Sequence, residues 1–91
     1  MGFDEVTRLF RRKRSIEILQ LLASETELNF SDIVEEIPSS TDTVSGTLTL
    51  LNELGLVERE QHHTNDVRYR ITERGRTVLA NIQEISTSIQ E

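Results

Sequence analysis

The sequence has no cysteine and no tryptophan, and it has one proline, one tyrosine and one lysine. The absence of cysteine excludes a disulfide framework, a thiolate metal site and a thiol nucleophile. With so few aromatic residues, the core has to be aliphatic. No apolar run approaches the ~18 residues of a membrane span, and no apolar segment typical of a signal peptide follows the N-terminus. We therefore expect a cytoplasmic protein that does not enter a membrane.

Positive charge is also scarce. Ten basic residues face 16 acidic ones, for a net charge of −6. This is the wrong sign for contact with phosphates, unless the protein works at molar salt, where the electrostatic part of DNA binding is screened. Many acidic residues and almost no lysine are typical of proteins from a cytoplasm at molar salt. The alternative is an ordinary acidic protein that never touches DNA.

The first third of the chain is predicted to be mostly helical. Residues 4–24 have apolar positions spaced three and four apart, interrupted by the basic run 11–14. This pattern fits one long helix or two helices that meet near residue 12. Residues 26–30 suit a very short strand, and Ser31 is a good N-cap for a helix that Pro38 ends.

A second capped helix follows. Ser39 or Ser40 can cap it, and Val44, Leu48 and Leu51 recur at helical spacing and should face the core. Gly55 occupies the position where a glycine ends a helix in left-handed geometry.

Two strands and a last helix complete the pattern. A strand begins at 56–57, a polar tip is predicted at 61–66, and the returning strand alternates apolar 67, 69 and 71 with Arg68 and Arg70. Thr72 then caps the last helix.

This order predicts a winged helix-turn-helix, a mainly α fold with a small β-hairpin wing (α+β) and a C-terminal dimerisation helix. We expect one domain over residues 1–91, with the helix-turn-helix at about 31–54, the wing at about 56–71 and the C-terminal helix at about 73–90.

The second helix of the motif would enter the major groove, with its N-terminal residues nearest the bases. It contains no lysine or arginine, but it does contain Asp42 and Glu53. Hydroxyl and methyl groups would then have to read the DNA, and Gly46 would permit a close approach of a backbone. The alternative is that these residues are simply solvated.

Arginines elsewhere could bind the phosphates. Arg59, Arg68 and Arg70 lie on the wing, although Arg68 and Arg70 could instead pair with Glu58 and Glu60. The basic run at 11–14 is the densest positive patch, and its alternative is a solvated helix face paired with nearby acids. The candidate DNA-binding residues are Ser40, Thr41, Asp42, Thr43, Ser45, Gly46, Thr49, Arg59, Arg68, Arg70, Arg12 and Arg14.

The last helix carries an apolar seam spaced like a heptad repeat. Isoleucines along it extend past the expected globule, and burying each would contribute ~1.5–3 kcal/mol, which favours a partner helix from a second chain. The candidate dimerisation residues are Val6, Leu9, Phe10, Val78, Ile82, Ile85 and Ile89.

Several strings resemble a known family. Residues 30–33, 37–38, the leucines at 48, 51 and 54, Gly-Leu-Val-Glu-Arg at 55–59 and Tyr-Arg-Ile-Thr-Glu-Arg-Gly at 69–75 are similar to winged-helix transcriptional regulators. The similarity is closest to the HxlR- and MarR-like groups, in a form typical of halophilic archaea. The resemblance implies a DNA-binding regulator. Such regulators usually carry basic residues in the recognition helix, and this chain has none there.

The sequence predicts no catalytic constellation, no metal site and no cofactor. His62 and His63 are adjacent on the predicted tip, without the further ligands that would preset a metal site. We therefore expect a homodimeric, sequence-specific DNA-binding transcriptional regulator rather than an enzyme. The rival is a winged-helix protein-interaction module that does not bind DNA. Double-stranded DNA and a second copy of the chain are the expected partners, and the sequence identifies no effector.

Overall fold

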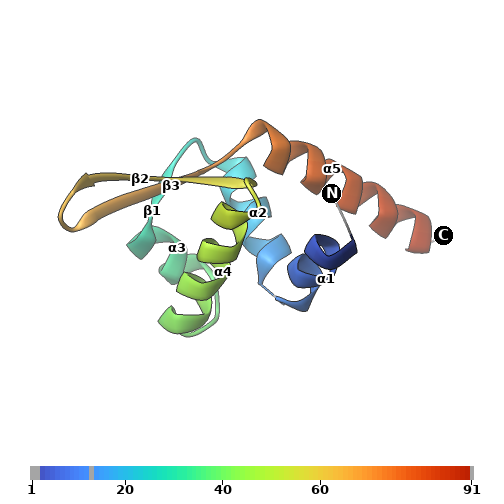
Figure 1. Cartoon of the computed structure of the whole chain (residues 1–91), viewed down its shortest axis with the longest axis horizontal. Coiled ribbons are helices and arrows are strands. Elements are labelled where there is room, and N and C mark those ends of the chain that lie inside the picture. The colour runs from blue at the N-terminus through green and yellow to red at the C-terminus, as the bar shows by residue number, and fades with distance from the viewer. Residues whose placement is uncertain (1–2, 13, 91) are drawn as a thin grey trace.

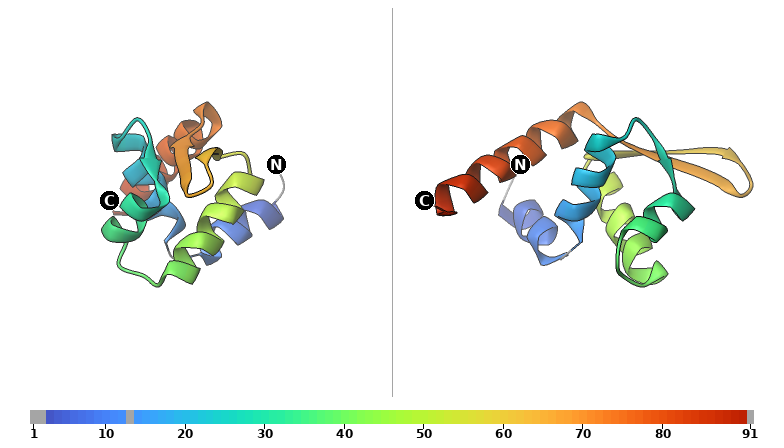
Figure 2. Two further views of the ribbon diagram at one scale, coloured as in Figure 1. Left: turned by 90° about the vertical axis from the view of Figure 1, so that its left-hand side faces the viewer. Right: turned by 180° about the vertical axis from the view of Figure 1, so that it is seen from behind.

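The computed structural model describes residues 3–12 and 14–90 (Figure 1). Its elements are α1 (Phe3–Arg11), α2 (Ser15–Ser24), β1 (Leu28–Asn29), α3 (Phe30–Glu36), α4 (Thr41–Glu53), β2 (Val57–His63), β3 (Asp66–Ile71) and α5 (Glu73–Gln90). The β2–β3 hairpin projects from one end of the molecule and α5 runs out toward the other (Figures 1 and 2). The fold is the predicted winged helix-turn-helix.

The N-terminal segment forms two helices, α1 and α2, rather than one long helix, so the second of the two predicted alternatives is confirmed. The backbone N–H of Ser15 donates to the carbonyl of Arg12 at 3.0 Å between α1 and α2. The break separates α2, which supplies buried Ile18, Leu19 and Leu22, from α1, whose one fully buried side chain among the described residues is Leu9.

The two helices of the helix-turn-helix begin at different kinds of cap. The predicted cap Ser31 lies inside α3, and the Asn29 side chain caps this helix instead by accepting from the N–H of Asp32. Asn29 pairs in β1 and is still extended, as an N-cap must be, so the strand leads directly into the helix. Of the two predicted candidates, Ser39 and Ser40, it is Ser40 that caps α4, accepting from the N–H of Thr43 at 3.2 Å.

Both helices end where the sequence indicates. Ile37 adopts an extended conformation before Pro38, which ends α3. Gly55 has a φ of 76°, the left-handed conformation that follows the end of α4.

The sheet is antiparallel, in the order β1-β3-β2. Arg59 lies opposite Tyr69, and Glu58 lies opposite Arg70. The strands continue further into the hairpin than predicted, because residues 61–63 belong to β2 and Asp66 belongs to β3. The turn itself is therefore Thr64 and Asn65, and an irregularity between Gln61 and His63 adjusts the pairing.

The hydrophobic core lies where α2, α4, α5 and the base of the sheet meet. It is aliphatic apart from Tyr69, as predicted. Its buried hydrophobic residues are Leu9, Ile18, Leu19, Leu22, Ile33, Ile37, Val44, Leu48, Leu50, Leu51, Leu56, Val57, Tyr69, Ile71 and Leu79. Among the described residues, no helix is long and apolar enough to cross a membrane.

Thr72 anchors the start of α5. Its hydroxyl donates to the carbonyl of Gly55 at 2.7 Å and accepts from the N–H of Gly75 at 3.0 Å. These bonds hold the start of α5 beside Gly55 and Leu56, which follow α4, and Leu79 of α5 is buried. Further along α5, Ile85 and Ile89 are exposed.

Candidate nucleic-acid interface

The exposed face of α4 is the surface that a winged helix would present to DNA. Of the predicted contacts, Thr41, Asp42, Ser45 and Thr49 are exposed, whereas Thr43 and Gly46 are half-buried. Two hydroxyl groups already have partners, because Thr49 donates to the carbonyl of Ser45 and the hydroxyl of Ser40 donates to that of Thr43. The hydroxyl oxygens of Ser40 and Thr49 can still accept hydrogen bonds. A phosphate group needs donors, so these two hydroxyl groups do not bind it as they are placed.

Helix α1 supplies positive charge beside this face. A groove of about 370 Å³ separates α1 from α4, lined by Arg8, Arg11, Arg12, Gly46, Thr49, Leu50 and Glu53. Arg8 pairs with Glu53 at 2.9 Å. The guanidinium of Arg12 lies over Gly46, where a Cβ atom would approach its Nη1 to 2.8 Å. A side chain, rather than the predicted backbone, therefore makes the close approach to Gly46.

The wing lines the other side of α4. Arg59 shares a hollow of about 340 Å³ with Ser45 of α4 and Ser31 of α3. It lies opposite Tyr69, on the side of the hairpin that faces the core. Among the described residues, Arg59 forms no ion pair with an acid. It is thus a cation available to a ligand placed between wing and helix.

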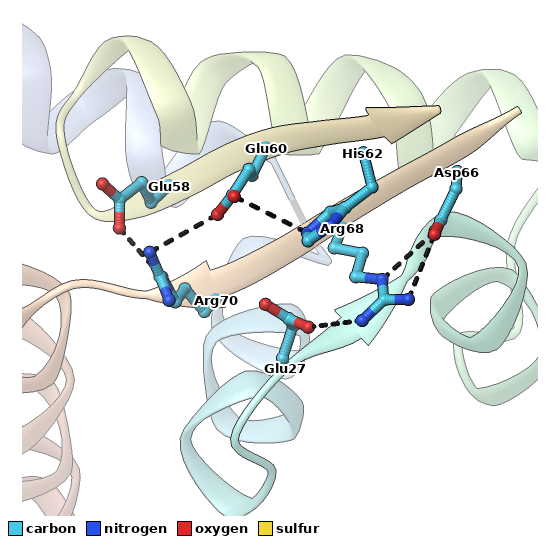
Figure 3. A network of polar contacts seen from close by, with 7 residues as sticks. All are labelled: Glu27, Glu58, Glu60, His62, Asp66, Arg68 and Arg70. Atoms are coloured by element: carbon cyan, nitrogen blue, oxygen red, sulfur yellow. Dashed lines mark hydrogen bonds and ion pairs between the residues drawn. The ribbon is translucent and has the colours of Figure 1, made fainter. Parts of the chain in front are cut away.

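Arg68 and Arg70 lie on the opposite, outer side of the hairpin and are already paired (Figure 3). Arg68 bonds both oxygens of Asp66 and one oxygen of Glu27, at 3.0–3.2 Å. Arg70 pairs with Glu58 at 3.0 Å and approaches Glu60 at 3.6 Å.

Arg70 therefore adopts the cross-strand pairing weighed above, whereas Arg68 pairs with Asp66 of its own strand and with a residue that precedes β1. These hydrogen bonds hold the pKa of Asp66 below its ordinary value and raise the pKa values of both guanidinium groups.

On the same side of the wing lie three residues of the types that bind metal ions. Ligand atoms of Glu27, Glu60 and His62 lie within 4.8 Å of one another. The carboxylates of Glu27 and Glu60 already pair with Arg68 and Arg70, so guanidinium groups take the place that a metal ion would occupy in this cluster. Sequence reasoning paired His62 with His63 and missed Glu27, because only the pairing of β1 with β3 brings Glu27 to this face.

Arg14 has a different place from the other arginines of the basic run. It bonds the hydroxyl of Ser39, the carbonyl of Pro38 and the carboxylate of Glu17 at 2.6–3.1 Å. Its side chain is 19% exposed. Arg14 thus ties the turn between α3 and α4 to the start of α2. Lys13, within the same run, lies outside the described residues.

The predicted basic run at 11–14 included Arg11, but Arg8 was not predicted as a contact, although its sequence signal was present. Positions 8 and 11 share one face of α1, away from apolar Val6 and Phe10, and position 12 would continue that face if the helix were one residue longer. What the spacing did not reveal is that this face lies along α4.

The other side of α1 forms an apolar groove with α5. Its volume is about 200 Å³, and its lining includes Val6, Phe10, Val78, Ile82 and Ile85. Val6 and Phe10 are 38% and 49% exposed, and Ile85 and Ile89 are 54% and 78% exposed.

Leu9, predicted to join the dimer surface, is buried in the domain's own core and has little surface left for a partner. Val78 and Ile82 pack partly against the same core.

Comparison with known proteins agrees with this architecture. The chain is 32% identical over 75 residues to the uncharacterized protein MJ0944 of Methanocaldococcus jannaschii, covering 78% of this chain and 62% of that protein. The chain thus spans less than two thirds of the length of this relative.

Several solved structures are similar, and two of them illustrate the match. One is the reduced form of the transcriptional regulator YodB from B. subtilis (26% identity, TM-score 0.78, 92% of this chain and 84% of that one). The other is the homodimeric winged helix-turn-helix DNA-binding domain of Mb0332 from Mycobacterium bovis (29% identity, TM-score 0.76, 98% and 84%). The model of the HxlR-like helix-turn-helix family matches residues 9–91. The chain therefore belongs to the HxlR-like helix-turn-helix family.

Proposed function

We propose that this chain is a sequence-specific DNA-binding transcriptional regulator that acts as a homodimer. The observation that carries the proposal is the position of α4 between two sources of positive charge. Arg59 of the wing lies on one side of the helix, and Arg11, at the end of α1, and Arg12, just after it, lie on the other. A helix in the major groove has a phosphate backbone on each side, so this arrangement suits it even though the helix itself has no basic residue.

The proposed contacts divide into two classes. Ser40, Thr41, Thr43, Ser45 and Thr49 would face base edges and thymine methyl groups, and Asp42 would disfavour wrong registers by repelling phosphate. Phosphate contacts would come first from Arg59 and the arginines of α1. Arg68 and Arg70 would bind phosphate by exchanging their carboxylate partners, so removing either should change affinity less than removing Arg59.

The homodimer would form through the apolar groove between α1 and α5 and the exposed isoleucines beyond it. Burial of Ile85 and Ile89 would contribute ~1.5–3 kcal/mol each if complete. One similar structure is described as homodimeric. Two copies would place their α4 helices in successive major grooves, with half-sites ~10 base pairs apart or a multiple of that distance.

The acid-rich composition supports a high-salt setting, typical of a halophilic archaeon. The proposed binding to chromosomal DNA would place the protein in the cytoplasm. At molar salt the electrostatic attraction to DNA is weak, so α4 would read DNA chiefly through short-range contacts. We expect the thermal midpoint of the protein to rise with KCl concentration up to the molar range.

Selection from a genomic DNA pool at several KCl concentrations tests the proposal. Recovery of a shared, pseudo-palindromic sequence is expected, with a loss of affinity when one half-site is scrambled. Failure to retain any DNA between 0.1 and 1 M KCl would overturn it.

The rival function, a protein-interaction module, is favoured by one observation. Asp42 and Glu53 are exposed on α4, and acidic groups there repel phosphate. If the DNA pool is not retained while Asp42→Ala abolishes binding of a protein partner, this rival replaces the regulator.

A further inference from the structure

Gly46 is an unusual residue for the middle of α4. Glycine in a helix interior is less favourable than alanine by ~0.8–1.0 kcal/mol. Its φ is not positive, so the backbone does not require glycine at this position. The reason lies in its surroundings. A Cβ atom here would lie 2.8, 3.3 and 3.4 Å from the Nη1, Nη2 and Cζ atoms of Arg12, so glycine leaves the space that the guanidinium occupies.

The groove around this contact keeps a net positive charge. Arg8, Arg11 and Arg12 contribute three positive charges and Glu53 one negative charge, which leaves a net charge of +2. Arg8 is the one that pairs with Glu53, at 2.9 Å. Within the described part of the chain, neither Arg11 nor Arg12 pairs with an acid, and both are exposed. Two guanidinium groups without anionic partners therefore line a groove on the rim of the recognition helix.

The groove also contains little that would repel an anion. The one lining carboxylate, that of Glu53, is paired with Arg8. The hydroxyl of Thr49 donates its proton to the carbonyl of Ser45, so the donors to an anion here are the guanidinium groups. Guanidinium groups match phosphate geometry with two parallel hydrogen bonds. A backbone phosphate of a DNA duplex fits this donor set, because α4 would lie in the adjacent groove.

We infer that the α1–α4 groove is a binding site for a DNA backbone phosphate. The absence of a side chain at Gly46 leaves room for the Arg12 guanidinium over the recognition helix, and Arg11 assists. The end of α1 and the residue after it thus supply, beside the recognition helix, the positive charge that this helix lacks. This inference rests on the proposed DNA binding and identifies which part of the chain contacts one of the two flanking phosphate strands.

Two substitutions test the site from opposite directions. Arg12→Ala removes one phosphate contact, which should flatten the slope of log affinity against log salt concentration by ~0.9. Extrapolated from 1 M, that slope change amounts to about an eightfold loss of affinity at 0.1 M salt. Gly46→Ala changes no charge but displaces the guanidinium. It should also weaken binding, while the melting temperature stays the same or rises because alanine favours the helix.

The assay is fluorescence anisotropy between 0.1 and 1 M KCl, on a duplex recovered from the genomic pool. The double variant should bind no more than about twofold more weakly than Arg12→Ala alone, because both changes remove the same contact. Arg76→Ala is the charge-matched control: Arg76 bonds the carbonyl of Ala23, away from α4, and its loss should leave affinity nearly unchanged.

The outcomes separate this inference from the proposed function. If the wild type binds no DNA, the regulator proposal fails. If the wild type binds DNA and both variants bind equally well, the phosphate site is wrong while the regulator proposal stands. If Arg12→Ala weakens binding and Gly46→Ala does not, the role assigned to Gly46 is wrong.

Discussion

Gly75 and Gly46 both lie in helices without a positive φ, yet the structure predicts opposite results when each is replaced by alanine. Helix propensity alone favours alanine by ~0.8–1.0 kcal/mol in a helix interior, as at Gly46, and by at most that amount at Gly75 in the first turn of α5. At Gly75, however, a Cβ atom would overlap the backbone carbonyl oxygen of Leu56 and lie 2.7 Å from Cγ1 of Ile71. At Gly46 the neighbour is the end of a flexible arginine side chain, which can move.

The expected size of the Gly75→Ala effect follows from these contacts. Carbon atoms pack best at ~3.5–4.0 Å, so the new methyl group would be about 1 Å too close to Ile71. Overpacking costs ~1–3 kcal/mol, and the upper part of that range applies because the carbonyl belongs to the rigid junction of α4, β2 and α5. After the gain in helix propensity, a net loss of about 2 kcal/mol remains. For a domain of this size, that corresponds to a fall of ~8–16 °C in the melting temperature.

Thermal unfolding followed by circular dichroism, at one protein and salt concentration, measures both variants. The concentration has to be fixed because dimerisation would shift the midpoint. Gly75→Ala should melt well below the wild type, and Gly46→Ala at the same temperature or slightly above it. A Gly75→Ala variant as stable as the wild type would refute the packing argument, since propensity would then outweigh the overlap.

Three further predictions follow from the surface. Ile85→Lys should convert the dimer to a monomer in sedimentation equilibrium, and a wild-type chain that is already monomeric at micromolar concentration would contradict the proposed interface. Because Arg68 lowers the pKa of Asp66 in the folded protein, their pairing should stabilise the wing at pH values above 3.8, the ordinary pKa of the carboxyl group. This stabilisation should be lost as the pH falls through the lowered pKa of Asp66. NMR shifts at Asn65 that titrate with the ordinary carboxyl pKa would argue against the pairing. Asp42→Ala should strengthen binding to random-sequence DNA, and a complete loss of binding would instead show that Asp42 makes a favourable contact.

Local signals predicted much of the fold. A serine N-cap at position 39 or 40, Gly55 in the left-handed conformation and the alternation around Tyr69 were each predicted from a few neighbouring residues. These features depend on backbone sterics and on hydrogen bonds between residues close in the chain, so the sequence carries them directly. The cap at Asn29 was missed because Ser31 offered an equally good local signal, and pairing of β1 with β3 extended Asn29 instead.

Long-range contacts decided what the arginines do. The sequence indicated that Arg68 and Arg70 face solvent, but the sheet brings Glu27 beside Arg68 and leaves Arg59 as the wing arginine turned toward α4. The sequence likewise showed a recognition helix without basic residues, and only the packing of α1 against the rest of the domain places Arg12 over Gly46. A side chain's charge is a property of its sequence position, whereas the partner that neutralises it depends on which distant segments the folded core brings together.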